Sequence, residues 1–228
     1  MSLSRRGFVL GVSALLAGCA SSGPDHRANY AAIPAEKFPL PAMPIDKIDP
    51  ELRRQQVSYA SSYSPGTIVV DTPARRLYYI LGDNQAMRYG VGVGREGLAF
   101  AGGAYVGRKA EWPSWTPTEN MQRREERYRK LAGGMPGGPN NPLGARAIYL
   151  YRGGNDTHFR IHGTNQPQSI GLAMSSGCIR MLNADVIDLY SRVEVGTKIV
   201  VLPNHSTVAE IAAPAPAVPY DLHRPIRY

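Results

Sequence analysis

A single thiol and a histidine are the residues of this chain whose types and spacing best fit a chemical reaction. Cys178 follows the small residues Ser175, Ser176 and Gly177, and His162 ends a run of strand-forming residues. A thiol attacks a carbonyl group well only as a thiolate, and the pKa of a free cysteine is about 8.5. A nearby imidazole that accepts the thiol proton makes such a cysteine a nucleophile. The pair therefore predicts acyl transfer through a covalent thioester.

The residues around this pair fit the other needs of that reaction. Gly177 permits backbone angles that point successive N–H groups in one direction, so the N–H groups of Gly177 and Cys178 are candidates for binding an oxyanion. A histidine base must be held in one tautomer by an acceptor on its second ring nitrogen. The nearest carboxylate in sequence is Asp156, so the carbonyl of Gly163 is a candidate for this acceptor.

Two other interpretations of these residues remain open at this point. Cys178 could be a buried small hydrophobic residue, and the histidine next to Gly163 could be unrelated to it. Alternatively, His158 and His162 would share one face of a strand and could bind zinc together with Cys178 and a carboxylate. The chain contains no CxxC or HExxH pattern that would support a zinc site.

The elements that must position the pair are mostly strands. β-Branched and alternating segments predict strands at 67–71, 76–81, 87–93, 104–112, 146–151, 157–162 and 197–202. Two helices are predicted, one over 118–131 with Thr118 as its cap, and one over 183–193 with Asn183 as its cap. The Gly- and Pro-rich residues 132–145 must form a loop.

The first residues read as an export signal. Arg5 and Arg6 precede an apolar stretch that is too short to span a bilayer, and the stretch ends in Leu16-Ala17-Gly18-Cys19. This resembles a lipobox, in which the cysteine is lipidated, and the two arginines also resemble a twin-arginine signal. An ordinary cleaved signal with a chance cysteine is the alternative. We expect a signal peptide over 1–18, lipid on Cys19, and a Pro- and Ala-rich tether over 19–65, extended over 20–50.

Composition limits the remaining possibilities. The net charge of +8 comes from scattered basic residues, and no nucleic-acid motif accompanies them, so no nucleic-acid partner is expected. The chain has two cysteines, and lipidation of Cys19 would leave Cys178 as the one thiol of an exported protein. We expect one domain over 66–203 and a C-terminal extension over 204–228, with no metal and no cofactor.

The stretch from His162 to Met181 resembles the signature of the YkuD-type L,D-transpeptidase catalytic domain. In that family a His-Gly pair is followed by a variable stretch and then by S-x-G-C-x-R or S-x-G-C-x-N, as in Ser175-Ser176-Gly177-Cys178-Ile179-Arg180 here. Residues 138–144 and the strands from Ile68 also look like the family, so the resemblance covers about 66–202. Many members have histidine where this chain has Ser176, and the hydrogen bond of that histidine must be absent or replaced.

The resemblance implies a mostly β domain, a curled mixed sheet or β-sandwich with one or two short helices beside the cysteine loop. It also implies that Cys178 attacks the stem peptide of peptidoglycan after its third residue, with His162 as base. Gly163 and Gly177 complete the catalytic set that it implies. The residues expected to contact substrate are Thr164, Asn165, Ser175, Ser176 and Arg180, although Arg180 could equally form a surface salt bridge.

The motifs do not specify the group that resolves the thioester, and the cellular location follows from the first residues alone. The thioester could be resolved by the amine of a second stem, by water as in a carboxypeptidase, or by a lysine of an outer-membrane protein that becomes attached to the wall. A non-catalytic wall-binding lipoprotein is a further alternative, which the intact Cys/His pair disfavours. Carbapenems are expected to acylate Cys178. We expect a periplasmic protein anchored in a membrane through Cys19, and Ala20 favours the outer membrane.

Overall fold

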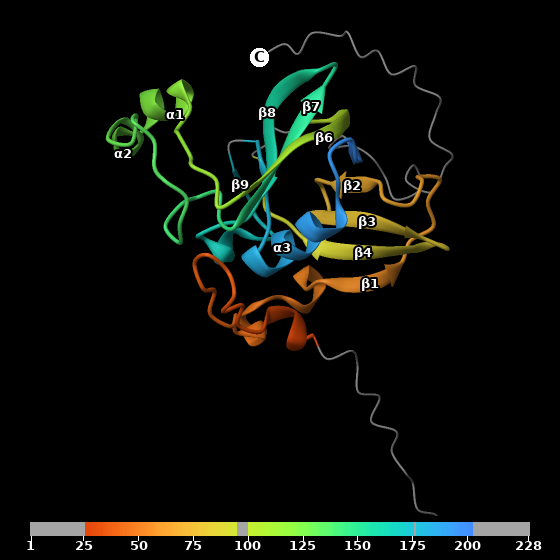
Figure 1. The fold of residues 1–228 in the computed structure, drawn as a ribbon. Helices are drawn as coiled ribbons and strands as arrows, with labels where there is room; N and C mark the ends of the chain where they lie inside the picture. The colour runs from red at the N-terminus through yellow and green to blue at the C-terminus, as the bar shows by residue number, and fades with distance from the viewer. Residues whose placement is uncertain (1–25, 95–99, 176, 203–228) are drawn as a thin grey trace, which may run out of the picture.

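A computed structural model describes residues 26–94, 100–175 and 177–202, and the chain there is mostly strand (Figure 1). This confirms the predicted mostly β fold with a mixed sheet. The strands are β1 (Gln55–Ser58), β2 (Ile68–Asp71), β3 (Arg76–Gly82), β4 (Gln85–Gly90), β5 (Val93–Gly94), β6 (Gly102–Glu111), β7 (Arg146–Arg152), β8 (Asn155–His162), β9 (Ala173–Ser175), β10 (Ile179–Arg180) and β11 (Lys198–Val201). The helices are α1 (Glu119–Arg124), α2 (Glu126–Arg129) and α3 (Asn183–Arg192), with 3₁₀ turns η1 (Ala28–Tyr30), η2 (Ile45–Lys47), η3 (Pro50–Leu52) and η4 (Pro167–Ser169).

Nine strands of the described residues form one sheet in the order β1-β4-β3-β2-β11-β6-β7-β8-β10. β11 runs parallel to β2 and β10 runs parallel to β8, whereas the other neighbours are antiparallel. In Figure 1 the part from β1 to β2 crosses the part from β6 to β8 at a steep angle, and α3 lies in the angle between them. β5 and β9 form a separate parallel pair.

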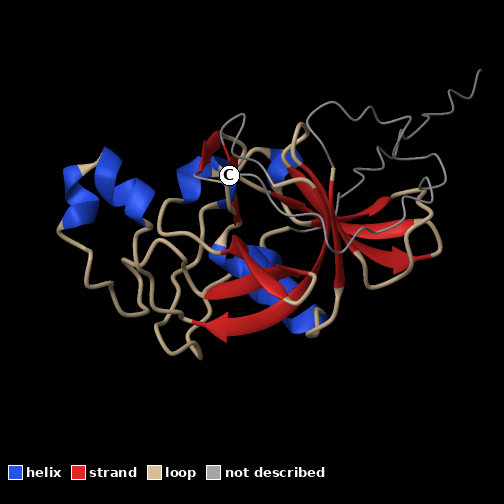
Figure 2. Cartoon of the chain, turned by 90° about the horizontal axis from the view of Figure 1, so that it is seen from above, coloured by secondary structure: helices blue, strands red, loops and turns tan. Residues whose placement is uncertain are grey.

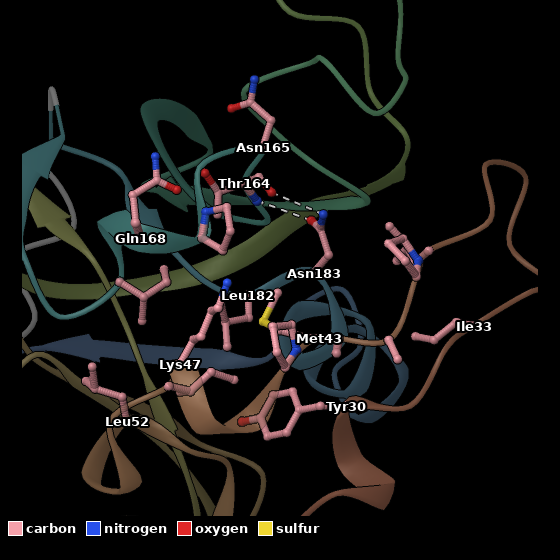
Figure 3. Close-up of a pocket in the computed structure, with 18 of the residues that line it drawn as sticks. Tyr30, Ile33, Met43, Lys47, Leu52, Thr164, Asn165, Gln168, Leu182 and Asn183 are labelled. Carbon is pink, nitrogen blue, oxygen red and sulfur yellow. Dashed lines mark hydrogen bonds between the residues drawn. The ribbon is translucent and has the colours of Figure 1, made fainter.

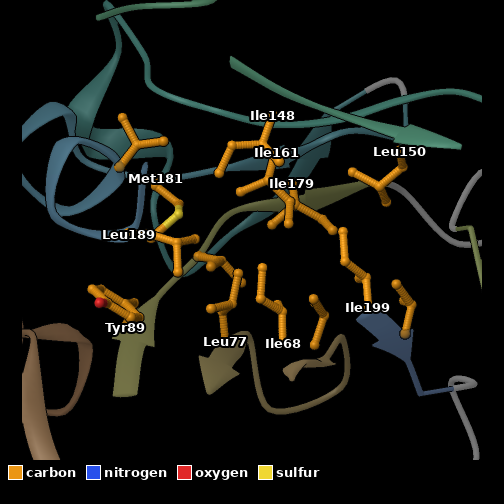
Figure 4. Packing of buried hydrophobic residues seen from close by; sticks show 14 of the residues in the cluster. Ile68, Leu77, Tyr89, Ile148, Leu150, Ile161, Ile179, Met181, Leu189 and Ile199 are labelled. Carbon is orange, nitrogen blue, oxygen red and sulfur yellow. The ribbon is translucent and has the colours of Figure 1, made fainter. Parts of the chain in front are cut away.

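The main core fills the space between the two parts of the sheet and α3. Side chains of β2, β3 and β4 face those of β7, β8 and β10, with α3 closing one side (Figure 4). Residues at each end of this arrangement, such as Ile68, Ile161 and Leu189, have no exposed surface. Burial of each such side chain contributes about 1.5–3 kcal/mol.

The N-terminal arm, which we define as residues 26–54, corrects the expectation of an extended tether. Tyr30, Ile45 and Ile48 are buried against Ile170 and Leu182 of the domain. The arm is built from isolated 3₁₀ turns that each bury one or no residue, and so its apolar residues have no period to detect. The part of the expected tether at 19–25 lies outside the described residues, as do the signal peptide, Cys19 and residues 204–228.

Two helix predictions need correction as well. The helix expected over 118–131 is broken at Glu125, whose φ and ψ of −138° and 125° are those of a strand, although Thr118 caps α1 as expected. Neither α1 nor α2 has a buried residue, so no apolar face holds one continuous helix together. α3 forms as predicted, but its N-cap is Leu182, and the side chain of Asn183 bonds elsewhere. Within the described residues, no helix is both long and apolar enough to cross a membrane.

Candidate active site

His162 is the last residue of β8 and is almost completely buried, with 4% of its surface exposed. Its Nδ1 lies 2.6 Å from the carbonyl oxygen of Gly163, the acceptor that the sequence predicts. A carbonyl oxygen only accepts, so Nδ1 carries the ring proton and Nε2 keeps its lone pair. Burial, together with the charges of Arg180 and Arg160, lowers the pKa of His162 to about 4. The ring is therefore a neutral base at neutral pH.

Cys178 directly precedes β10, which pairs in parallel with β8 so that Arg180 lies opposite His162. Ile161 and Ile179 point into the core, so His162, Cys178 and Arg180 belong to the opposite face of these two strands. His162, Cys178 and Arg180 all line one cavity of about 240 Å³. The structure therefore brings the thiol and the neutral imidazole into a common space.

The electrostatics of Cys178 favour proton transfer at the moment of attack rather than a permanent ion pair. Burial raises the pKa of the half-buried thiol, while the backbone and charge of Arg160 and the charge of Arg180 oppose this rise. Its Sγ lies 4.0 Å from the carbonyl oxygen of His158. Both groups are neutral in the resting protein, and so His162 is placed to act as a general base.

The backbone before the thiol is held by a close glycine contact. Gly177 has a φ of 125°, which favours glycine, and a Cβ on Gly94 of β5 would lie 2.7 Å from the Gly177 Cα. Strand β5 also pairs Gly94 with Ser175 of β9. The β5–β9 pair thus packs directly against the backbone of Gly177, which precedes Cys178. Ser176 lies outside the described residues, as does the side chain of Ser175.

The sequence predicts Asn183 as the cap of α3, but its side chain bonds to other parts of the chain. Its Oδ1 accepts hydrogen bonds from the backbone N–H groups of Ala145 at 3.0 Å and Thr164 at 3.2 Å, and its Nδ2 donates to the Thr164 carbonyl at 3.1 Å. Figure 3 shows the two bonds with Thr164. A Cβ on Gly163 would lie 2.2 Å from this Oδ1. Asn183 therefore clamps the segment that supplies the acceptor of His162, a role that no sequence spacing signals.

Thr164 and Asn165 differ in their surroundings. Thr164 is buried, accepts a hydrogen bond from the Gln166 N–H and lines an apolar cavity of about 770 Å³ between the N-terminal arm and the domain (Figure 3). Asn165 is exposed, donates to the Asn140 carbonyl at 2.8 Å and lines both this cavity and the one with Cys178. The structure thus places Asn165, but not Thr164, at the wall of the thiol cavity.

The outer wall of the site comes from residues 113–143. Trp115, Met121 and Tyr128 line the 240 Å³ cavity and also a neighbouring cavity of about 500 Å³ that Cys178 lines as well. Figure 2 shows α1 and α2 at one end of the molecule, away from the strands. The sequence predicts a helix over 118–131 and a loop over 132–145, but it does not indicate which of their side chains face the thiol.

The zinc alternative loses its ligand set in this arrangement. His158 has a φ of 62°, and its backbone N–H donates a hydrogen bond to the Asp156 carboxylate at 2.8 Å. Across the described ranges, no group of three or more His, Cys, Asp or Glu side chains gathers closely enough to hold a metal ion. The contact of His162 Nδ1 with the Gly163 carbonyl is compatible with a base and with a zinc ligand alike, so the zinc interpretation loses its support through the missing neighbouring ligands.

The family model of the YkuD L,D-transpeptidase catalytic domain matches residues 65–201. The chain belongs to this family. The L,D-transpeptidase domain is 39% identical over 139 residues to the probable L,D-transpeptidase ErfK/SrfK of Escherichia coli, covering 59% of this chain and 43% of that protein. The chain thus spans less than half of the length of the first relatives that it matches.

Two solved structures are also similar to the L,D-transpeptidase domain. A Brucella melitensis protein named as a probable carnitine operon oxidoreductase is 50% identical, with a TM-score of 0.47 and coverage of 69% of this chain and 98% of that one. A C442S mutant of the Enterococcus faecium L,D-transpeptidase is 20% identical, with a TM-score of 0.46 and coverage of 61% and 50%. The family assignment follows from the family model, which matches residues 65–201.

Proposed function

We propose that this L,D-transpeptidase domain forms a thioester between Cys178 and a tetrapeptide stem of peptidoglycan and transfers the stem to an amine of a second stem. One observation carries the proposal: a buried histidine, held by the Gly163 carbonyl as the Nδ1–H tautomer, shares a cavity with Cys178. An imidazole whose Nε2 lone pair is available, in the same cavity as a thiol, is consistent with what nucleophilic cysteine catalysis requires. Membership of the family is consistent with a peptidoglycan substrate and supports this part of the proposal.

The proposed first half-reaction moves one proton and one acyl group. His162 Nε2 takes the Cys178 proton as the sulfur attacks the carbonyl after the third residue of the stem. The N–H groups of Gly177 and Cys178 bind the oxyanion, which is worth about 2.7–4 kcal/mol per donor in transition-state stabilisation. The bond to the terminal D-alanine then breaks, and His162 returns the proton to the departing amine. The product is a thioester on Cys178.

The second half-reaction restores the thiol. An amine of a second stem attacks the thioester, His162 accepts a proton from that amine, and the sulfur leaves as a thiolate that regains the proton. Water would give a shortened stem, and a lysine of an outer-membrane protein would give an attached protein instead. Cys178 lines two neighbouring cavities of about 500 and 240 Å³ that share part of their walls, and this space offers room for a second peptide beside the donor. This favours transfer between stems.

The test is incubation of the protein with a purified tetrapeptide-stem muropeptide and mass analysis of the products. Transfer predicts a cross-linked dimer that has lost one D-alanine for each new bond. Cys178→Ala should form neither dimer nor shortened monomer while unfolding at the same temperature as the parent. A shortened monomer alone would replace the transfer proposal with hydrolysis, and turnover by Cys178→Ala would refute the covalent route.

Location is a separate proposal that rests on the sequence of the first residues. We infer that Cys19 is lipidated and holds the domain in the periplasm, with the outer membrane favoured by Ala20. Metabolic labelling with a fatty acid should mark the parent chain and leave Cys19→Ala unlabelled. Equal labelling of both chains, or labelling of neither, would refute lipidation of Cys19.

A further inference from the structure

The space around the Cys178 thiol is rich in arginine. Four arginines line the two cavities that reach the thiol: Arg124, Arg127, Arg160 and Arg180. Among the described residues that line these cavities, Glu125 is the one with an acidic side chain. Such an excess of one charge sign in a cleft attracts ligands of the opposite sign.

Two of these arginines are neutralised within the protein. Arg160 makes two hydrogen bonds to the Asp156 carboxylate, at 2.7 and 2.9 Å, and its guanidinium lies 4.3 Å from the centre of the Tyr149 ring. Arg127 pairs with Glu125 at 2.6 Å. Their charges are therefore compensated before any substrate arrives.

Arg180 and Arg124 are different. Neither guanidinium has an ion pair or hydrogen bond with another side chain in the part of the chain that the structure describes. Arg180 is half-buried beside the thiol, and burial lowers the pKa of its guanidinium. A partly desolvated charge without a counter-ion is costly, and a carboxylate that binds to it recovers this cost. A surface salt bridge, the other sequence-based interpretation of Arg180, does not form among these residues.

The two arginines reach the same space from different elements. Arg180 belongs to β10 next to the nucleophile, and Arg124 belongs to α1 in the outer wall, yet both line the 500 Å³ cavity with Cys178. Guanidinium groups bind carboxylates through paired N–H donors, and these charge-assisted bonds are among the stronger polar contacts in proteins. A donor peptide with its reacting carbonyl at Cys178 would present its neighbouring groups to this cavity.

Building on the proposed function, we propose that Arg180 and Arg124 bind a free carboxylate on the side chain of the donor's third residue, the residue that is transferred. The protein then selects stems with that carboxylate over stems in which it is a carboxamide. Arg180 places the carboxylate next to the reacting carbonyl, and Arg124 contacts it from α1. Both are specificity-determining residues, and neither moves a proton in the reaction.

The test compares two synthetic tetrapeptides that differ only in a carboxylate or a carboxamide on the third side chain. Binding is measured by calorimetry with the full chain carrying Cys178→Ala, which cannot turn over, and D-alanine release is measured with the unmodified thiol. We expect the carboxylate peptide to bind about tenfold or more tightly, because it gains charge-assisted hydrogen bonds that the amide lacks. Added salt should reduce this ratio.

Matched variants assign the preference to residues. Arg124→Gln should reduce the ratio several-fold, whereas Arg123→Gln on the same helix should keep it, because Arg123 pairs with Glu119 at 3.4 Å and does not line the cavity. Arg180→Gln should make the dissociation constants of the two peptides equal, and Arg180→Lys should restore part of the difference between them. Unfolding temperatures show whether each variant is folded.

Two results would overturn the inference: equal dissociation constants for the two peptides, or an unchanged ratio in both Arg180→Gln and Arg124→Gln. Failure of the proposed function gives a different result. In that case the carboxylate peptide still binds more tightly to Cys178→Ala, but the protein with its thiol releases no D-alanine from either peptide. The binding preference and the reaction are thus judged by separate measurements.

Discussion

Replacement of Asn183 by alanine should loosen the segment that orients His162. The Asn183 side chain makes three hydrogen bonds to backbone groups of Ala145 and Thr164 at 3.0–3.2 Å. Alanine leaves two N–H groups and one carbonyl without this partner. At about 1 kcal/mol for each lost bond, and somewhat more where water cannot enter, the free energy of unfolding should fall by about 2–4 kcal/mol. The cost is large for one side chain on the first turn of a helix.

The same replacement should slow acylation of Cys178. Gly163, whose carbonyl holds His162 Nδ1, packs against the Asn183 Oδ1, and its backbone is freed when that atom is removed. Misplacement of a catalytic group by about 1 Å reduces rates roughly 100-fold, so a partial effect of about 10–100-fold is expected. Urea unfolding measures the stability, and intact-mass spectrometry of the thioester measures the rate.

Asn155→Ala is the matched control for Asn183→Ala. The Asn155 side chain is exposed and donates one bond, to the Gly153 carbonyl at 3.2 Å. Its removal should change the free energy of unfolding by less than about 0.5 kcal/mol and leave acylation unchanged. If Asn183→Ala were as mild as this control in both assays, the clamp would have no energetic importance and the reasoning would be wrong.

Three further predictions concern titration, the cysteine loop and the arm. Burial raises the pKa of Asp185 to about 7, so the part of the unfolding free energy that depends on its protonation is lost as pH rises towards 7. The pKa of His162 is lowered to about 4, so the part that depends on the neutral imidazole is lost as pH falls below 6.5. The resulting changes in the free energy of unfolding, about 4 kcal/mol for Asp185 and about 3 kcal/mol for His162, have opposite signs. Urea unfolding between pH 4 and 7 should therefore show stability rising with pH in Asp185→Asn and falling with pH in His162→Gln. Equal slopes in both variants would contradict this assignment. Gly94→Ala should slow thiol alkylation about tenfold, because its Cβ would lie 2.7 Å from the backbone of Gly177; an unchanged alkylation rate would show that the loop adapts freely. Tyr30→Phe removes a buried hydroxyl that bonds to Asp185 at 3.3 Å and should cost about 1–3 kcal/mol and open the arm to proteolysis; protease resistance equal to that of the parent would disprove that the hydroxyl holds the arm.

The strands and α3 could be predicted because their buried residues form local patterns. Ile68, Val69 and Val70 are a β-branched run in a strand that is buried on both faces, and Val186, Leu189 and Val193 follow the period of a helix packed on the core. These patterns depend on local sequence alone. The Gly163 carbonyl as the acceptor for His162 could also be predicted, because the contact joins adjacent residues.

The rest depends on contacts that no local pattern encodes. The N-terminal arm is held by Arg54, which pairs with Asp188 at 2.9 Å, and by the Tyr30 hydroxyl, which bonds to Asp185. Its prolines and small residues fit a tether equally well in isolation. Asn183 has the right type for a helix cap, but its neighbours in space offer it three backbone partners elsewhere. In both cases tertiary packing overrides a correct local preference.

The proposed mechanism depends on removal of the Cys178 proton by the imidazole of His162. We would measure the rate at which a carbapenem acylates the thiol, by intact mass from pH 3 to pH 9, in the parent and in His162→Gln. A base at His162 predicts a parent rate that rises through a pKa of about 4 and then stays level to neutral pH, and a variant at least about 100-fold slower at pH 7. Equal rates for the two proteins at pH 7 would refute the role of His162 as the base.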